Sequence, residues 1–214
     1  MFEGIRKLLG IKTEKEPTFA DCDLVLLGMG NPGQEYAKTR HNIGWMVLLT
    51  LIAKHGHAFS KGKGNYAYAK ININGKVVLA LLSFSYMNLS GHVIAKLFDR
   101  YPTLKDRLMI VVDEYNFPLG KIHIRKGGSD GGHNGVQSLI SELGTDEFYR
   151  LRCGISKNFG AGELVNYVLS QFDEDEIPIR DQMLRDAVEA LKYFIDNEPA
   201  RAMSMINSGE IFKK

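Results

Sequence analysis

Residues 24–54 read LVLLGMGNPGQEYAKTRHNIGWMVLLTLIAK and contain three successive kinds of sequence. The run Leu24–Leu27 is continuously apolar and ends at Gly28, as expected of a strand buried in a parallel sheet. A glycine-rich loop follows, and the segment from Met46 to Lys54 is typical of a helix that stops at Gly56. A buried strand, a loop and a helix in this order predict an α/β fold.

The rest of the chain continues this alternation of strands and helices. Asn74-Gly75 separates two apolar segments, 66–73 and 77–83, and predicts a hairpin. The patterns predict further strands at 108–112, 121–125 and 151–155, and helices at 90–100, after His133 to 143 and at 184–195. Because one hairpin interrupts the crossovers, we expect a three-layer sandwich with helices on both faces of a twisted, mixed but mostly parallel sheet.

Length and composition predict a single globular domain with a short extension. The chain has 214 residues, of which 44% are hydrophobic, and we assign 1–22 to an N-terminal extension and 23–214 to the domain. No apolar run approaches the roughly 18 residues that cross a membrane. The N-terminal segment carries Glu3, Glu14 and Glu16 and resembles no secretory signal. Two cysteines cannot form a disulfide framework, so we expect a cytoplasmic protein.

Charge is unevenly distributed, although the net charge is only +2. No Asp or Glu occurs from Tyr36 to Phe98, a stretch that holds seven lysines and Arg40, whereas acids cluster at 173–176. A basic face of this kind favours a polyanionic partner, because phosphate contacts release counterions. Solvated lysines without a partner are the alternative, and charge alone does not separate the two.

The loop GMGNPG at 28–33 matches the dinucleotide fingerprint GxGxxG in its letters only. That fingerprint needs an acidic residue about 20 positions further on to bind the ribose, and the acid-free stretch supplies none. Pro32 also favours an extended Asn31 over a loop that turns directly into a helix. We therefore interpret the loop as a display of Asn31 at the carboxyl end of a strand, where open α/β sheets bind ligands.

Other polar residues occupy equivalent places along the chain. Asp113 follows the apolar run LMIVV, Asn88 follows the second hairpin strand, and Asn134 follows the glycine-rich loop GGSDGGHNG. His41 closes the loop that begins at Asn31. Each residue also has a structural alternative, as a turn former or a helix cap, but together they predict one site at the edge of the sheet.

Such a site suits hydrolysis by an activated water. His41 could act as a general base, with Asp113 accepting its other ring proton, and asparagine amides could stabilise an oxyanion. No GxSxG occurs, the two cysteines occupy ordinary apolar positions, and the six histidines show no metal-ligand spacing with carboxylates or thiols. Arg125 and Arg152 flank the glycine loop in sequence and could bind a phosphate, or could be surface charges.

The sequence resembles the bacterial-type peptidyl-tRNA hydrolase family over about residues 24–206. Four ordered motifs carry the resemblance: GMGNPGQEYAKTRHNIGW, SYMNLSG, VVDEYNFPLGKIHIRKGGSDGGHNGVQSLISELGT and FYRLRCGI. The resemblance implies that His41 is the catalytic base and that Asp113 orients it. It also implies that Asn31 holds the peptide and the attacking water, and that Asn134 binds substrate and stabilises the intermediate.

The resemblance assigns further residues to the two ends of the substrate. Met87 and Asn88 would shape the pocket and bind the peptide main chain, and Tyr36 would contact the acceptor end of the tRNA. Arg125 and Arg152 would clamp the 5′-phosphate of the tRNA. The family implies a monomer that needs neither metal nor cofactor and recycles tRNA.

Four features depart from the family pattern, and two other functions stay open at this stage. Asn116 stands where Asp is common, His123 where a basic residue is common, GISKN replaces GIGRP, and the extension 1–22 is unusual. A non-catalytic RNA-binding protein on the same fold is one alternative, and a general esterase is the other. Turnover of peptidyl-tRNA, and its dependence on the tRNA, separates the three functions.

Overall fold

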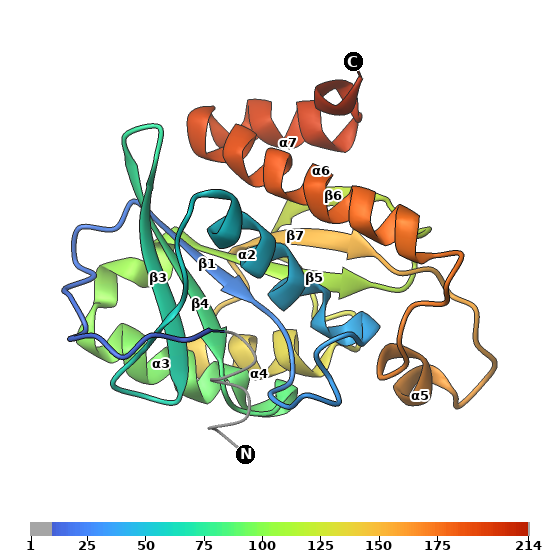
Figure 1. Cartoon of the computed structure of the whole chain (residues 1–214), viewed down its shortest axis with the longest axis horizontal. Helices are drawn as coiled ribbons and strands as arrows, with labels where there is room; N and C mark the ends of the chain where they lie inside the picture. The colour runs from blue at the N-terminus through green and yellow to red at the C-terminus, as the bar shows by residue number, and fades with distance from the viewer. Residues whose placement is uncertain (1–9, 214) are drawn as a thin grey trace.

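The computed structural model describes residues 10–213, which form a seven-stranded sheet in the order β2-β3-β4-β1-β5-β7-β6 (Figure 1). The central strands β4, β1, β5 and β7 are parallel, whereas β2, β3 and β6 pair antiparallel with their neighbours. The predicted mixed sheet is therefore confirmed. The strands are β1 (Leu24–Gly28), β2 (Ser60–Lys61), β3 (Tyr66–Ile73), β4 (Lys76–Ser83), β5 (Leu108–Glu114), β6 (Ile122–Lys126) and β7 (Tyr149–Gly154).

Helices cover both faces of this sheet and make the predicted three layers (Figure 1). The α-helices are α2 (Ile43–Lys54), α3 (Ser90–Arg100), α4 (Asn134–Leu143), α5 (Leu164–Val168), α6 (Ile177–Asp196) and α7 (Pro199–Asn207). Short 3-10 helices are η1 (Arg40–Asn42), η2 (Met87–Leu89), η3 (Pro102–Arg107) and η4 (Glu210–Phe212). Among the described residues, no helix is both long enough and apolar enough to span a bilayer.

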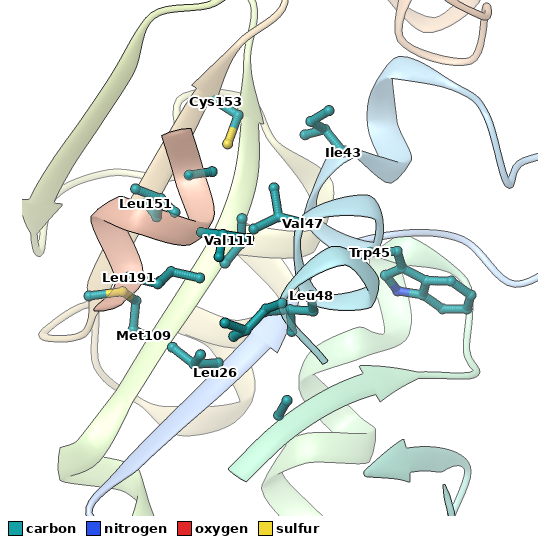
Figure 2. Packing of buried hydrophobic residues seen from close by; sticks show 14 of the residues in the cluster. Leu26, Ile43, Trp45, Val47, Leu48, Met109, Val111, Leu151, Cys153 and Leu191 are labelled. Carbon is teal, nitrogen blue, oxygen red and sulfur yellow. The ribbon is translucent and has the colours of Figure 1, made fainter. Parts of the chain in front are cut away.

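One apolar layer lies between the sheet and the helices α2 and α6 (Figure 2). Leu26 of β1, Val111 of β5 and Leu151 of β7 point toward Leu48 of α2 and Leu191 of α6, and all five are completely buried. Burying each such side chain contributes about 1.5–3 kcal/mol. This layer holds α2 in place, and α2 directly follows the turn that carries His41.

The second apolar layer lies under α3 and α4 on the opposite face. Leu27 and Ile110 of the sheet pack there with Ile94 of α3 and Leu139 of α4. Phe19, which belongs to the predicted N-terminal extension, is completely buried in the same layer. Residues 10–22 thus pack against the domain, and residues 1–9 of the predicted extension lie outside the described residues.

Local sequence signals account for most of the element boundaries. Asn74 and Gly75 have φ values of 50° and 87°, which suit the tight hairpin turn between β3 and β4. Gly144 ends α4 in the left-handed conformation with φ 64°, as glycine at this position commonly does. The predicted helix 90–100 agrees with α3 in both bounds.

Other boundaries differ from the predictions. Helix α2 begins at Ile43, before the predicted start at Met46, because Ile43 and Trp45 bury apolar surface in the core. Strand β5 extends to Glu114, so Asp113 lies within the strand and not after it. The short helix α5 and the helix α7 were not predicted, and tertiary packing on β6 holds α7.

Candidate active site

The predicted site residues gather where β1, β4 and β5 end. Asn31 follows β1, Met87 begins η2 just beyond β4, and Asp113 lies near the end of β5. His41 reaches the same place in η1, because α2 begins against the sheet. A Cβ on Gly44 would lie 2.2 Å from the carbonyl oxygen of Val111, so only glycine permits this approach.

Asp113 lies between two imidazole rings. Its Oδ1 is 2.9 Å from His41 Nδ1 and 3.0 Å from His133 Nε2, and the two ring centroids are 4.7 Å apart. The carboxylate is 2% exposed, whereas the His41 side chain is 11% exposed. The chain thus places a buried carboxylate behind a histidine that still reaches solvent.

Burial and ion pairing act against each other on these groups. Burial would lower the pKa of His41, but attraction to Asp113 and their hydrogen bond outweigh it, so the pKa is raised. Burial would raise the pKa of Asp113, but the two histidines outweigh burial and hold that pKa well below its ordinary range. Asp113 therefore stays ionised and His41 loses its proton at a higher pH than a free imidazole does.

The environment of His133 determines which of its nitrogens carries the proton. Its Nδ1 accepts from the backbone N–H groups of Gly135 and Val136, at 3.1 and 3.3 Å, at the start of α4. Its Nε2 is therefore the protonated nitrogen and donates to Asp113. Sequence analysis recognised His133 only as the residue before a helix, because its contact with β5 is purely tertiary.

His41, Asp113 and His133 are also a group that could hold a metal ion, since their ligand atoms lie within 4.8 Å of one another. A metal ligand must offer a lone pair, which a neutral imidazole does on its unprotonated nitrogen. Nδ1 of His133 already accepts from two backbone N–H groups, so Nε2 carries the proton and donates to Asp113. Nε2 therefore has no lone pair to offer a metal ion. The hydrogen bonds therefore favour a base held by a carboxylate over a metal centre.

Asn31 is held by two polar contacts on its backbone and one on its side chain. Asn42 accepts from the Asn31 N–H and donates to the Asn31 carbonyl, both at 2.9 Å, and Asn42 is completely buried. The N–H of Met87 donates to Asn31 Oδ1 at 2.8 Å. The amide oxygen is thereby occupied, and the NH₂ group is the part of the side chain that can donate to a ligand.

A cavity of about 230 Å³ opens beside these residues. His41, Asp113 and Asn134 line it, together with Arg125 and Leu164 of the short helix α5. Met87 packs against Gly135, where a Cβ would lie 2.5 Å from the methionine sulfur. His41, Asp113 and the exposed Asn134 thus share one cavity with Arg125, Arg150 and Arg152.

The arginines near this cavity differ in their partners. Arg150 is buried and donates to the carbonyl oxygens of Gly128 and Ser129, so it holds the glycine loop in place. Arg152 is paired with Glu114, whose other oxygen accepts from Asn116 at 2.9 Å. Arg125 lines the cavity, and no carboxylate among residues 10–213 forms an ion pair with it.

Four predicted site residues do not line this cavity: Asn31, Tyr36, Met87 and Asn88. Asn88 is exposed in η2, one residue beyond Met87. Tyr36 is half-buried in the turn before η1, where its carbonyl oxygen accepts from Thr39. The structure brings the predicted residues His41, Asp113, Arg125, Asn134 and Arg152 to one cavity, and it joins Asn31 to Met87 by a hydrogen bond.

Arg40 is a buried residue that sequence analysis did not assign to the site. Its guanidinium pairs with Glu176 at 3.1 and 2.5 Å and lies over the rings of Tyr167 and Phe172. Its N–H donates to the carbonyl oxygen of Ser170 at 2.9 Å. Arg40 therefore joins the turn that carries His41 to the segment around α5, and Glu176 belongs to the acidic cluster noted in the sequence.

Both cysteines are buried and unsuited to act as nucleophiles. Burial raises the pKa of Cys22 to about 11 and the pKa of Cys153 to about 12. A thiol with so high a pKa is protonated at neutral pH, and the thiolate is the reactive form. Water is therefore the nucleophile that this site can activate.

Comparison with known proteins places this geometry in a family. The family model "Peptidyl-tRNA hydrolase" matches residues 25–214. Peptidyl-tRNA hydrolase of Fervidobacterium nodosum is 42% identical over 188 residues, which cover 88% of this chain and 98% of the relative. The enzyme of Bacillus subtilis is 37% identical over 185 residues, 86% of this chain and 98% of the relative. The crystal structure of peptidyl-tRNA hydrolase from Acinetobacter baumannii is similar with a TM-score of 0.81 and 29% identity, over 90% of this chain and 98% of that one.

Proposed function

The chain belongs to the peptidyl-tRNA hydrolase family, and we propose that His41 is the general base with which it cleaves its substrate. It hydrolyses the ester bond that joins a peptide to tRNA and so returns the tRNA to translation. The observation that carries the catalytic proposal is the 2.9 Å contact between His41 Nδ1 and the buried Asp113 carboxylate. No observation favours a non-catalytic role.

The proposed reaction begins with a proton transfer. Because Nδ1 of His41 donates to Asp113, its Nε2 carries the lone pair and removes a proton from water. The water oxygen attacks the ester carbonyl and forms a tetrahedral intermediate. The intermediate then expels the ribose oxygen, which receives the proton from His41. The peptide acid and the tRNA are released as separate products.

Asparagine amides would bind the peptide and the intermediate. Met87 occupies Oδ1 of Asn31, which supports a role for the Asn31 NH₂ group as a donor to a substrate carbonyl or to the attacking water. Asn134 lines the cavity next to His41 and could donate to the oxyanion, a contact that typically contributes about 3–4 kcal/mol to a barrier. Asn88 would hold the peptide main chain.

The tRNA end of the substrate would lie on the β5–β7 side of the site. Arg125 and Arg152 come from the neighbouring strands β6 and β7 and could contact the 5′-phosphate, with Tyr36 contacting the acceptor end. Arg125 is the better supported of the two arginines, because Glu114 already neutralises Arg152. We also propose, from the family resemblance, that the enzyme acts as a cytoplasmic monomer.

Replacing the proposed base tests this mechanism. We expect His41→Ala to abolish turnover of peptidyl-tRNA in single-turnover assays, while tRNA binding and melting temperature stay unchanged. His57→Ala is the matched control, because His57 is exposed and remote from the cavity. Turnover by His41→Ala at the wild-type rate would remove His41 from the mechanism.

A second assay tests whether the enzyme needs the tRNA. We expect a much larger kcat/KM for a peptidyl-tRNA than for the same peptide esterified to adenosine, because remote binding energy positions the ester. Equal values for the two substrates would instead indicate a general esterase.

A further inference from the structure

A second cavity of about 480 Å³ lies between α3 and the ends of β3 and β4. We call it the α3 cavity. Tyr66, Val93 and Leu97 give it an apolar wall, and Leu89, which is 52% exposed, stands at its side. Lys63 and Lys96 line it as well. The α3 cavity thus combines apolar surface with amino groups.

The lining of the α3 cavity carries positive charge, because its described residues include Lys63 and Lys96 and no carboxylate. Among residues 10–213, Lys63 and Lys96 have no carboxylate within ion-pair distance of their amino groups. Arg100 also lines the cavity but is paired with Glu16. The other titratable groups that line it are His92, which lies 3.6 Å from Glu142, and Tyr66, which is hydrogen-bonded to Glu16. The two lysines therefore supply the uncompensated charge.

The wall of the α3 cavity depends on the N-terminal segment. Glu16 is buried, and its carboxylate accepts from Tyr66 Oη at 2.6 Å and from the Lys63 N–H at 2.7 Å. These contacts hold the turn that leads into β3. The region that matches the family model begins at residue 25, so Glu16 lies outside it.

The α3 cavity begins next to the proposed peptide-binding residues. Ser85 and Leu89 line it, and Met87 and Asn88 lie between them in the chain. It lies on the β3–β4 side of the sheet, whereas Arg125 lies on the β6–β7 side. A substrate ester at His41 has its tRNA and its peptide in opposite directions. If the tRNA takes the arginine side, the peptide passes Asn88 toward the α3 cavity.

We propose that the α3 cavity binds a side chain of the nascent peptide and favours an acidic one. The inference rests on the proposed function, because it requires the ester to lie at His41. We place this side chain two or three residues before the ester, because an extended peptide advances about 3.3–3.6 Å per residue and must first pass Asn88. The apolar wall would take the stem of a glutamate, and Lys63 and Lys96 would meet its carboxylate.

Matched substrates test this proposal. Peptidyl-tRNAs that share one tRNA and one peptide, but carry Glu, Gln or Lys two or three residues before the ester, are compared by kcat/KM. We expect the wild-type enzyme to prefer Glu over Gln by about threefold to fivefold, the range of a partly exposed charge pair. The Lys63→Ala/Lys96→Ala variant should lose this preference and cleave the Gln substrate at the wild-type rate. Lys54→Ala, on the far end of α2, is the matched control.

Charge reversal makes the test sharper. Lys96→Glu should shift the preference toward the Lys substrate. The proposal is overturned if the wild-type enzyme shows no preference, or if the preference survives the double substitution. It is also overturned if kcat/KM of the double variant falls equally for all three substrates and the variant binds deacylated tRNA more weakly. The cavity would then contact nucleic acid. Failure of the proposed base would look different, because His41→Ala would then cleave all three substrates.

Discussion

Glu16 and Asp113 are both buried carboxylates with several hydrogen bonds, yet only Asp113 lies at the site. Their side chains are 1% and 2% exposed, and burial acts to raise the pKa of both. Hydrogen bonds hold the pKa of Glu16 below its ordinary value, and attraction to the two histidines, with their hydrogen bonds, lowers the pKa of Asp113. The partners of Glu16 are Arg100, Tyr66 and a backbone N–H. The partners of Asp113 are two histidines.

The difference lies in what the partners can do with a proton. A guanidinium keeps its proton at every physiological pH, so the contact of Glu16 with Arg100 is permanent and structural. An imidazole exchanges its proton near neutral pH, so Asp113 supports a group that changes charge. Burial and a lowered pKa alone do not identify a functional carboxylate, whereas titratable partners beside a cavity do.

The largest expected effect comes from Asp113→Asn. The amide cannot hold His41 in the tautomer that exposes Nε2, so we expect kcat/KM to fall about 10³–10⁴-fold. Single-turnover cleavage of peptidyl-tRNA measures this loss. If activity fell less than tenfold, Asp113 would be a structural carboxylate like Glu16, and the proposed difference between them would be wrong.

The pH profile separates the two carboxylates next. His41 must be neutral to accept a proton, and Asp113 raises the pKa of His41. We therefore expect kcat/KM to rise with pH, about tenfold per unit below that pKa, and to level off only above the raised pKa. In Asp113→Asn the inflection should move to lower pH, since burial then acts unopposed. Glu16→Gln should leave the inflection in place.

Glu16→Gln should affect stability and leave the chemistry intact. We expect the free energy of unfolding to fall by about 1–3 kcal/mol at pH 7, with kcat/KM for a Gln-containing peptidyl-tRNA unchanged. Because the folded-state pKa of Glu16 is lowered, its contribution is present above the unfolded-state pKa and is lost as pH falls through the folded-state pKa. Urea denaturation at pH 7 and at pH 4 measures both effects. A large loss of activity in a folded variant would contradict the structural role.

The smallest expected effect concerns two of the arginines that line the cavity, Arg125 and Arg152. Arg125 has no carboxylate partner among the described residues, whereas Glu114 holds Arg152 as Glu16 holds Arg100. Arg125→Ala should therefore reduce the slope of log affinity for tRNA against log salt by about one. Arg152→Ala should reduce it less. Equal slopes in both variants and the wild type would exclude a phosphate contact at either position.

The predicted site residues were accessible to sequence analysis because they follow local rules. Asn31, Asp113 and Asn134 stand beside strands or a glycine loop, and the carboxyl ends of parallel strands meet at one edge. That rule predicts that His41 and Asp113 lie close together, although no local sequence pattern links the two residues. The hairpin at Asn74 and helix α3 were likewise predictable from turn residues and periodicity.

Residues that act through a partner elsewhere in the chain were not predictable in this way. His133 looks like a helix cap, and only its distance from Asp113 shows that it also contacts the buried carboxylate. Asn42 looks like one more polar residue after His41, and only its paired contacts with Asn31 show why it is buried. The helix α5 is too short for a periodic pattern, and Arg40 holds its surroundings through contacts more than 120 residues apart.

The sequence by itself determined the α/β class, the order of the strands and helices along the chain, and the loops that carry His41 and the asparagines. Periodicity and turn chemistry encode these features within a few residues. The tertiary structure decided which carboxylate faces a titratable ring, which of the cavity arginines is paired with Glu114, and which lysines border a cavity. Those properties depend on burial and on distances between segments remote in sequence, which set the electrostatic free energy of each charge.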